Sequence, residues 1–169
     1  MRVLLVFFLL VFSFSSCTDE AETLFEMDYR VDYNIAAGLN TFETHFFELF
    51  NIPTNATNLL QANNLTDGAI EAILPKSARL SSVFLSDDLD FIREISVRLI
   101  NGDNQNQTEI FFRENIPLDT RDFVDLIPTL PNVKQLMLED FHNLSIRMEF
   151  WEPTPTFLDV KLEFDFQVQ

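Results

Sequence analysis

The segment FEMDYRVDYNI, residues 25–35, alternates between apolar and polar side chains without a break. Its odd-numbered positions carry large apolar or aromatic residues, and its even-numbered positions carry charged residues or asparagine. Successive side chains of a β-strand point to opposite faces of a sheet, so this pattern predicts a strand with one buried and one solvated face. We therefore expect a core packed against one side of a sheet.

The same period of two returns near the C-terminus, over residues 144–151 and 160–168. A turn with Pro153 and Pro155 separates these segments, and we expect them to pair as an antiparallel hairpin with one dry face. Shorter alternating or apolar runs predict five further strands, at residues 44–50, 77–85, 95–99, 108–113 and 122–127. Asn101-Gly102 is typical of a hairpin turn between the strands at 95–99 and 108–113.

Two segments predict short helical inserts. One covers residues 67–74, capped by Thr66 and ended by Pro75, and the other lies within residues 132–140. The Asn-rich stretch at 53–64 predicts a loop. Seven or eight strands with one or two short helical inserts predict an all-β fold, an antiparallel two-sheet β-sandwich of immunoglobulin-like or C2-like type.

The first residues have the pattern of a secretory signal peptide. Arg2 supplies a positive charge, an apolar run follows at 3–12, and small residues at 13–16 lead to Cys17. The apolar run is too short for a permanent membrane helix, which needs about 20 residues. Cys17 is the only cysteine of the chain, whereas a secreted protein usually uses cysteines in pairs.

With Phe14-Ser15-Ser16-Cys17 at the cleavage point, the segment resembles the lipobox of bacterial lipoproteins, although Leu, Val or Ile usually stands where this chain has Phe14. The acidic residues that follow, at 19, 20 and 22, are similar to the export signal of Bacteroidetes-type cell-surface lipoproteins. The resemblance implies covalent lipid on Cys17 and a cell-envelope location as an outer-membrane, surface-exposed lipoprotein. An ordinary cleaved signal peptide is the alternative.

These features predict the organisation of the chain: a signal peptide at 1–16, an acidic tether at 17–23 and a single domain at 24–169. The formal charge of −16 would repel nucleic acid phosphates and anionic lipid headgroups, so neither is an expected partner. Nineteen Phe against two Tyr and one Trp favour a role for the aromatic residues in packing rather than in ligand platforms.

The sequence offers little catalytic chemistry. It has no Gly-x-Ser-x-Gly elbow, and three glycines cannot build a phosphate-binding loop. His45 and His142 lie far apart in the chain, and we expect them at strand margins rather than in a site. No cluster has the spacing of a zinc site.

Calcium is the one metal with candidate ligands. They are Asp87, Asp88 and Asp90 in one turn and Asp103 in another, but neither turn has a calcium-loop signature, so solvated turns are the preferred interpretation. We expect no cofactor beyond the lipid on Cys17.

The expected function is a non-catalytic accessory, adhesion or ligand-binding role at the cell envelope, with an envelope protein or a glycan as partner. Trp151 is the candidate contact residue, or else it covers a sheet edge. One alternative is a small glycan-acting hydrolase that uses paired carboxylates. Another is a structural subunit of an envelope complex, which an exposed apolar patch would favour.

Overall fold

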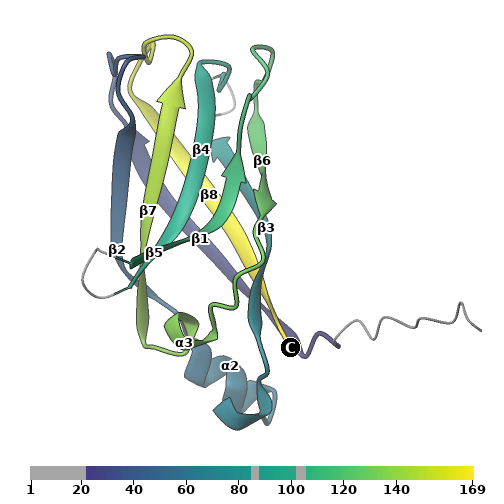
Figure 1. The fold of residues 1–169 in the computed structure, drawn as a ribbon. Helices are drawn as coiled ribbons and strands as arrows, with labels where there is room; N and C mark the ends of the chain where they lie inside the picture. Colours follow the sequence, from purple (N-terminus) through teal and green to yellow (C-terminus); the bar gives the residue numbers. More distant parts are fainter. Residues whose placement is uncertain (1–21, 85–87, 102–105) are drawn as a thin grey trace, which may run out of the picture.

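A computed structural model of the chain describes residues 22–84, 88–101 and 106–169. The described chain consists mainly of strands, with three short helical elements (Figure 1). In chain order the elements are β1 (Phe25–Ile35), β2 (His45–Pro53), α2 (Ala56–Ala62), the 3-10 turn η2 (Asp67–Ala69), β3 (Ile73–Ser82), β4 (Ile92–Asn101), β5 (Asn106–Arg113), β6 (Phe123–Pro128), α3 (Lys134–Met137), β7 (Phe141–Phe150) and β8 (Leu158–Val168).

All eight strands belong to one curled antiparallel sheet with the order β1-β8-β3-β6-β5-β4-β7-β2. Its two halves, β1-β8-β3-β6 and β5-β4-β7-β2, are joined through β5 and β6 by only two residue pairs, Phe111 with Pro128 and Phe112 with Ile127. The all-β prediction is therefore confirmed.

The pairing of the strands is nested. The first strand pairs with the eighth, the second with the seventh, the third with the sixth and the fourth with the fifth. A long hairpin rolled up on itself gives this order, which is the strand order of a jelly roll. In an immunoglobulin domain the first two strands pair directly, so the immunoglobulin-like alternative is wrong.

The core lies between the two halves of the sheet. The inward residues of β8 are all buried, from Leu158 to Val168 at every second position. Aromatic contacts cross from one half to the other, such as Phe111 with Phe164 at 6.3 Å between ring centroids. Each such ring contributes roughly 1.5–3 kcal/mol through burial. The alternation in the sequence thus identifies the core faces correctly.

The predicted C-terminal hairpin is wrong. β7 pairs with β2 and β4, whereas β8 pairs with β1 and β3, so the connection at 151–157 crosses from one half of the sheet to the other. Pro153 and Pro155 have no N–H to donate to a hairpin ladder. The predicted hairpin between β4 and β5 is confirmed.

Two helix assignments also change. The segment predicted as a loop contains α2, whose buried Ala56 and Leu60 face the core. The helix predicted at 67–74 is reduced to η2, for which Thr66 makes no side-chain cap hydrogen bond. Instead β3 begins at Ile73 and runs through Pro75, next to an irregularity in its register, where the missing N–H is tolerated.

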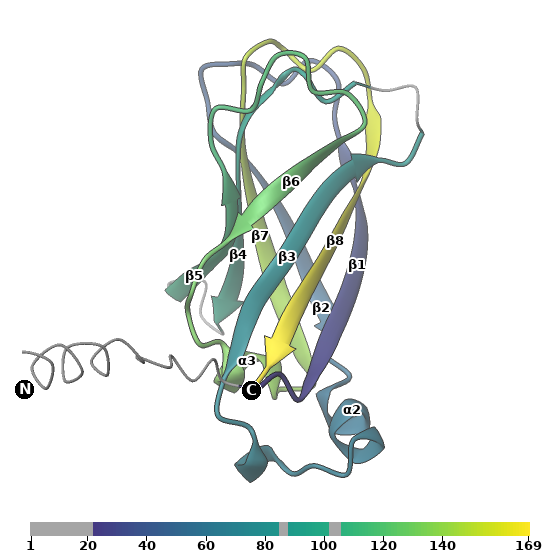
Figure 2. The ribbon, with the colours of Figure 1, turned by 90° about the vertical axis from the view of Figure 1, so that its right-hand side faces the viewer.

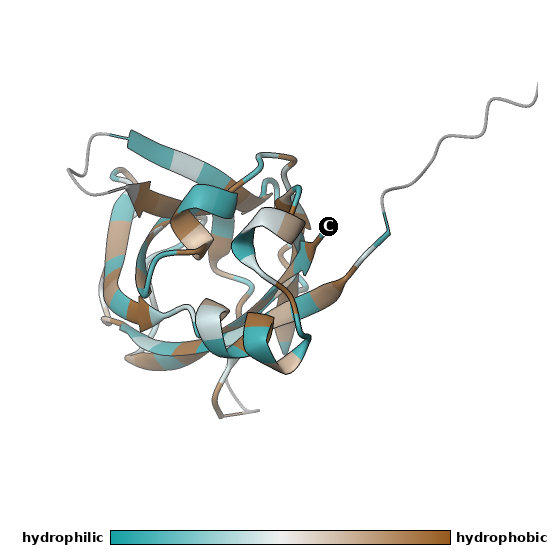
Figure 3. Ribbon diagram, turned by 90° about the horizontal axis from the view of Figure 1, so that it is seen from below, coloured by the Kyte–Doolittle hydropathy of each residue, from teal (hydrophilic) through white to brown (hydrophobic). Residues whose placement is uncertain are grey.

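The strands place their connections at two opposite ends. Residues 36–44, 83–84 with 88–91, 114–122 and 151–157 lie at one end, which we call the distal end (Figures 1 and 2). The start of β1 and the C-terminus lie at the other end, where the short helical elements cross below the sheet (Figure 3). Among the described residues, no helix has the length and apolar character needed to cross a membrane.

Candidate functional site

The distal end carries a set of exposed apolar side chains. Phe42 is 95% exposed, and Leu118 and Phe157 are 64% and 58% exposed. Single exposed apolar residues are ordinary, but several from four connections at one end of a fold indicate a contact surface. This set, which we call the distal apolar set, consists of Phe42, Val83, Phe84, Leu118, Trp151 and Phe157.

Buried Thr154 fixes two of the four connections to each other. Its Oγ1 accepts a hydrogen bond from the Leu39 N–H at 2.9 Å and donates one to the Ala36 carbonyl at 2.7 Å. Two backbone bonds complete the link, from Gly38 N–H to the Thr154 carbonyl and from Thr154 N–H to the Leu39 carbonyl. Gly38 has a φ of 77°, which L side chains adopt at a cost. The backbone on either side of Phe42 and Phe157 is therefore held in place.

Trp151 joins the remaining connections. Its indole N–H donates to the Ile116 carbonyl at 3.1 Å, and its backbone N–H donates to the Phe91 carbonyl at 2.8 Å. Its ring lies 5.7 Å from the Arg93 guanidinium and remains 42% exposed. The ring thus has a fixed orientation and a free face, and its predicted role as a contact residue stays a prediction.

A network of charged side chains supports this end from the outer face of the sheet. Glu149 on β7 accepts hydrogen bonds from Arg93, from Arg147 and, at 3.1 Å, from the hydroxyl of Thr44. The hydrogen bond from Arg93 is the main cause that holds the pKa of Glu149 below its ordinary value. A general acid needs a raised pKa, so Glu149 is tuned in the opposite direction.

Of the four calcium candidates, the structure describes Asp88 and Asp90. Asp87 and Asp103 lie outside the described residues, while Asp88 is exposed and Asp90 is half-buried in the connection before β4. Asn101 and Asn106, which flank the segment that contains Asp103, pair with each other as the last residue of β4 and the first residue of β5. No group of three or more His, Cys, Asp or Glu side chains in the described ranges could hold a metal ion. Cys17 and the signal peptide also lie outside the described residues.

The two histidines occupy different environments. His45 has its Nε2 2.9 Å from the Asn40 carbonyl, and its ring stacks on Phe150. His142 points into the core and is 4% exposed, and neither of its ring nitrogens has a hydrogen-bond partner among the described residues. Burial lowers its pKa from 6.5 to about 4. The sequence signal for this position was available, because His142 is in phase with the inward residues of β7.

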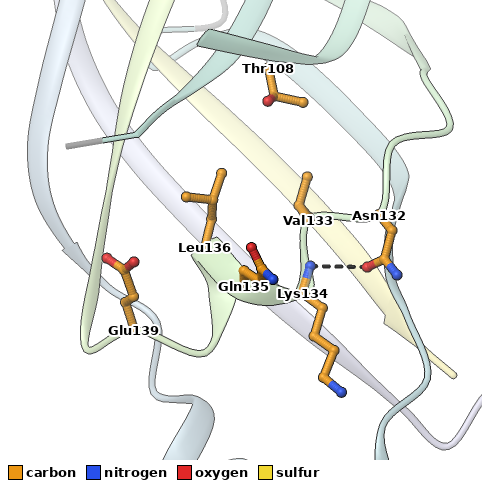
Figure 4. Close-up of a pocket in the computed structure, with 7 residues that line it drawn as sticks. All are labelled: Thr108, Asn132, Val133, Lys134, Gln135, Leu136 and Glu139. Carbon is orange, nitrogen blue, oxygen red and sulfur yellow. Dashed lines mark hydrogen bonds between the residues drawn. The ribbon is translucent and has the colours of Figure 1, made fainter. Parts of the chain in front are cut away.

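A hollow of about 520 Å³ lies beside α3, at the end opposite the distal apolar set (Figure 4). Two of its polar side chains, Asn132 and Lys134, already make hydrogen bonds within the fold. The Oδ1 of Asn132 accepts hydrogen bonds from the N–H groups of Lys134 and Ile73, and the Lys134 ammonium donates to the Ile70 carbonyl at 2.6 Å. These groups shape the chain around α3, so the hollow is a weaker candidate than the distal end.

Compared with protein-family models and with curated proteins, the chain matches none. Among solved structures it is similar to a chain described as "Desmodium yellow mottle tymovirus", with 10% sequence identity and a TM-score of 0.33. That similarity covers 85% of this chain and 86% of the other. A likeness this weak carries no argument about function.

Proposed function

We propose that this chain is a lipid-anchored module of the cell envelope that binds a partner, without catalysis, through its distal end. One observation carries the proposal: exposed large apolar side chains from four hydrogen-bonded connections lie at the end opposite the start of β1. An accessory, adhesion or ligand-binding role fits such a surface. The partner is an envelope protein or a glycan, and no cofactor is needed beyond the covalent lipid.

The start of β1 lies at the end opposite the distal end, which supports display of the distal end by the proposed anchor. Acyl chains on Cys17 hold the chain at the outer membrane, and two or more chains are needed for a stable anchor. The Leu24 N–H donates to the Val168 carbonyl, so the chain enters the sheet beside its own C-terminus. β1 then extends for eleven residues, about 35 Å, towards the distal end. This arrangement supports our proposal that the distal end faces away from the membrane.

We also propose that the two halves of the curled sheet serve as the two layers of a sandwich. The link of only two residue pairs between β5 and β6 supports this description. Each half has one buried face towards the other half and one exposed outer face, as the layers of a sandwich do. The distal connections then bridge the two layers at one end.

A structural subunit of an envelope complex is the second candidate function, because β2 is an edge strand with exposed apolar residues. Phe46 and Phe50 project from its outer face, 59% and 52% exposed, and Phe141 is 54% exposed on the neighbouring β7. Long apolar edge strands tend to pair with other chains. Mutation of these residues should break such a complex and leave the distal end unchanged.

The test of anchoring and display uses the absence of any cysteine other than Cys17. Wild type and Cys17→Ala are compared by membrane fractionation, and Phe42→Cys is labelled on intact cells with a membrane-impermeant maleimide. We expect wild type in the membrane fraction, Cys17→Ala released from it, and Phe42→Cys labelled. A soluble wild type would refute the anchor. Labelling that requires cell lysis would refute surface display.

A further inference from the structure

None of the carboxylates of the described distal connections forms an ion pair with a described Arg or Lys, whereas seven of the eleven carboxylates on the strands do. Seven carboxylates on the strands pair with Arg or Lys; they are Glu26, Asp32, Glu94, Glu109, Asp125, Glu149 and Glu163. The described distal connections carry seven more, none of which pairs with a cation among the described residues; they are Glu43, Asp88, Asp90, Glu114, Asp119, Asp122 and Glu152. Arg121 is the single cation of these described segments.

The distal end therefore combines two properties that do not help the isolated fold. Exposed Phe and Leu side chains gain nothing until they are covered, and carboxylates without counter-charges at one end of the fold repel one another. Six of the seven carboxylates are exposed, and Asp90 is half-buried. Contact with a surface that supplies both apolar side chains and positive charge would satisfy both groups at once.

We propose that the distal end docks a cationic polypeptide surface, one in which Lys or Arg side chains alternate with apolar side chains. This inference rests on the proposed binding function and names the chemistry of the partner. A second copy of the chain would bring the same seven carboxylates against each other. Neutral glycans would leave the carboxylates without counter-charges, and nucleic acid would be repelled.

The hydrogen bonds of the distal end make this docking surface preorganised. Thr154 ties residues 36–44 to residues 151–157, and Trp151 ties its own connection to residues 91 and 116. The Leu89 N–H donates to the Arg121 carbonyl at 3.1 Å and joins the other two connections. A partner therefore does not have to order these loops, and less of the contact free energy is lost on binding.

The test uses the full chain in phosphatidylcholine nanodiscs, with empty nanodiscs as blanks. The probes are short peptides that alternate Lys with Leu, Glu with Leu, or Lys with Ser. Trp151, the only tryptophan, reports binding by its fluorescence, and calorimetry gives the affinity. We expect the Lys-Leu peptide to bind most tightly and to weaken as salt rises towards about 0.5 M.

Matched variants separate the distal end from the rest of the surface. Phe157→Ser should weaken binding of the Lys-Leu peptide about tenfold, because a half-exposed ring loses its contact. Phe141→Ser, with a similar exposure at the other end, should bind as wild type does. Asp119→Asn with Glu152→Gln should weaken binding and flatten its salt dependence, while Glu26→Gln, whose carboxylate pairs with Lys76, should change neither.

Three outcomes would overturn the inference. The first is binding of the Glu-Leu peptide as tight as that of the Lys-Leu peptide. The second is an equal loss of affinity in Phe141→Ser and Phe157→Ser. The third is a dimer of the wild-type chain in analytical ultracentrifugation that Phe157→Ser dissociates and Phe141→Ser does not, which would place a second copy on this surface. Because peptide binding does not depend on membrane fractionation, failure of the anchor in cells would leave this result standing, and the reverse also holds.

Discussion

Replacement of His142 by phenylalanine should make the protein markedly less sensitive to acid. The imidazole is buried beside Tyr29 and Phe164, at 5.1 and 6.2 Å between ring centroids. Neither ring nitrogen has a hydrogen-bond partner among the described residues, and an unsatisfied buried polar group costs about 1–3 kcal/mol. Phenylalanine keeps an aromatic ring at this place and removes both nitrogens.

The magnitude follows from the lowered pKa of His142. Burial moves this pKa from 6.5 to about 4, so below pH 6.5 the unfolded chain binds a proton that the folded chain rejects. The stability from the neutral imidazole is complete above pH 6.5 and is lost as the pH falls to about 4. At about 1.4 kcal/mol per pKa unit, the total loss is about 3 kcal/mol.

The assay is urea unfolding near pH 7.5, 6 and 4.5, followed by circular dichroism and by Trp151 fluorescence. Between the first and last pH, wild type should lose about 2.5 kcal/mol more than His142→Phe. His45→Phe leaves the buried imidazole of His142 in place, so its stability should decline with falling pH as that of wild type does. If His142→Phe declines as steeply as wild type, then the imidazole is not held neutral by burial and the reasoning is wrong.

Three further substitutions test the distal end and the loops. Thr154→Val should lower the free energy of unfolding by about 2 kcal/mol in urea denaturation, because the Leu39 N–H loses its acceptor; Thr154→Ser, which keeps the hydroxyl, should lose much less. Asn115→Ala should cost about 1 kcal/mol in the same assay, since its φ is 51°, whereas Asn115→Gly should be close to neutral. Glu149→Gln should remove part of the acid sensitivity in a pH series of thermal unfolding. The lowered pKa of Glu149 gives stability that is complete above the ordinary carboxyl pKa and is lost as the pH falls through the lowered pKa. An unchanged pH profile in Glu149→Gln would show that the bond from Arg93 does not hold the charge.

The sequence is sufficient to assign the buried face of an alternating strand but not the strands that lie next to it in the sheet. The segment at 25–35 is a strand with the predicted bounds, and its inward Met27 and Ile35 are buried. A period of two says which side of a strand is apolar and is silent on which strand lies next to it. Because most of the strands have an apolar inward face, local pattern could not show that β8 pairs with β1 and β3 rather than with β7.

The predicted loop at 53–64 and the predicted helix at 67–74 were wrong because asparagine and proline each occur in more than one kind of local structure. Among the described residues four asparagines adopt a positive φ, and two of them, Asn55 and Asn64, flank α2. A high asparagine content therefore marked the ends of a short helix rather than a continuous loop. Pro75 is typical of a helix stop in the sequence, but it lies in β3 beside an irregularity of the ladder, where a missing donor is tolerated.

The distal surface could be predicted only in part, because it depends on which connections meet. Trp151 stands in a turn and was identified, whereas Phe42 and Leu118 are single apolar residues in unremarkable loops. The nested pairing of the strands brings those loops to one end.

The role of the acidic residues could not be predicted from the sequence either, because a net charge of −16 fits simple solubility. Solubility alone does not explain why seven of the eleven strand carboxylates pair with cations, whereas none of the seven in the described distal connections has such a partner among the described residues. That uneven distribution favours recognition over solubility as the role of the acidic residues at the distal end.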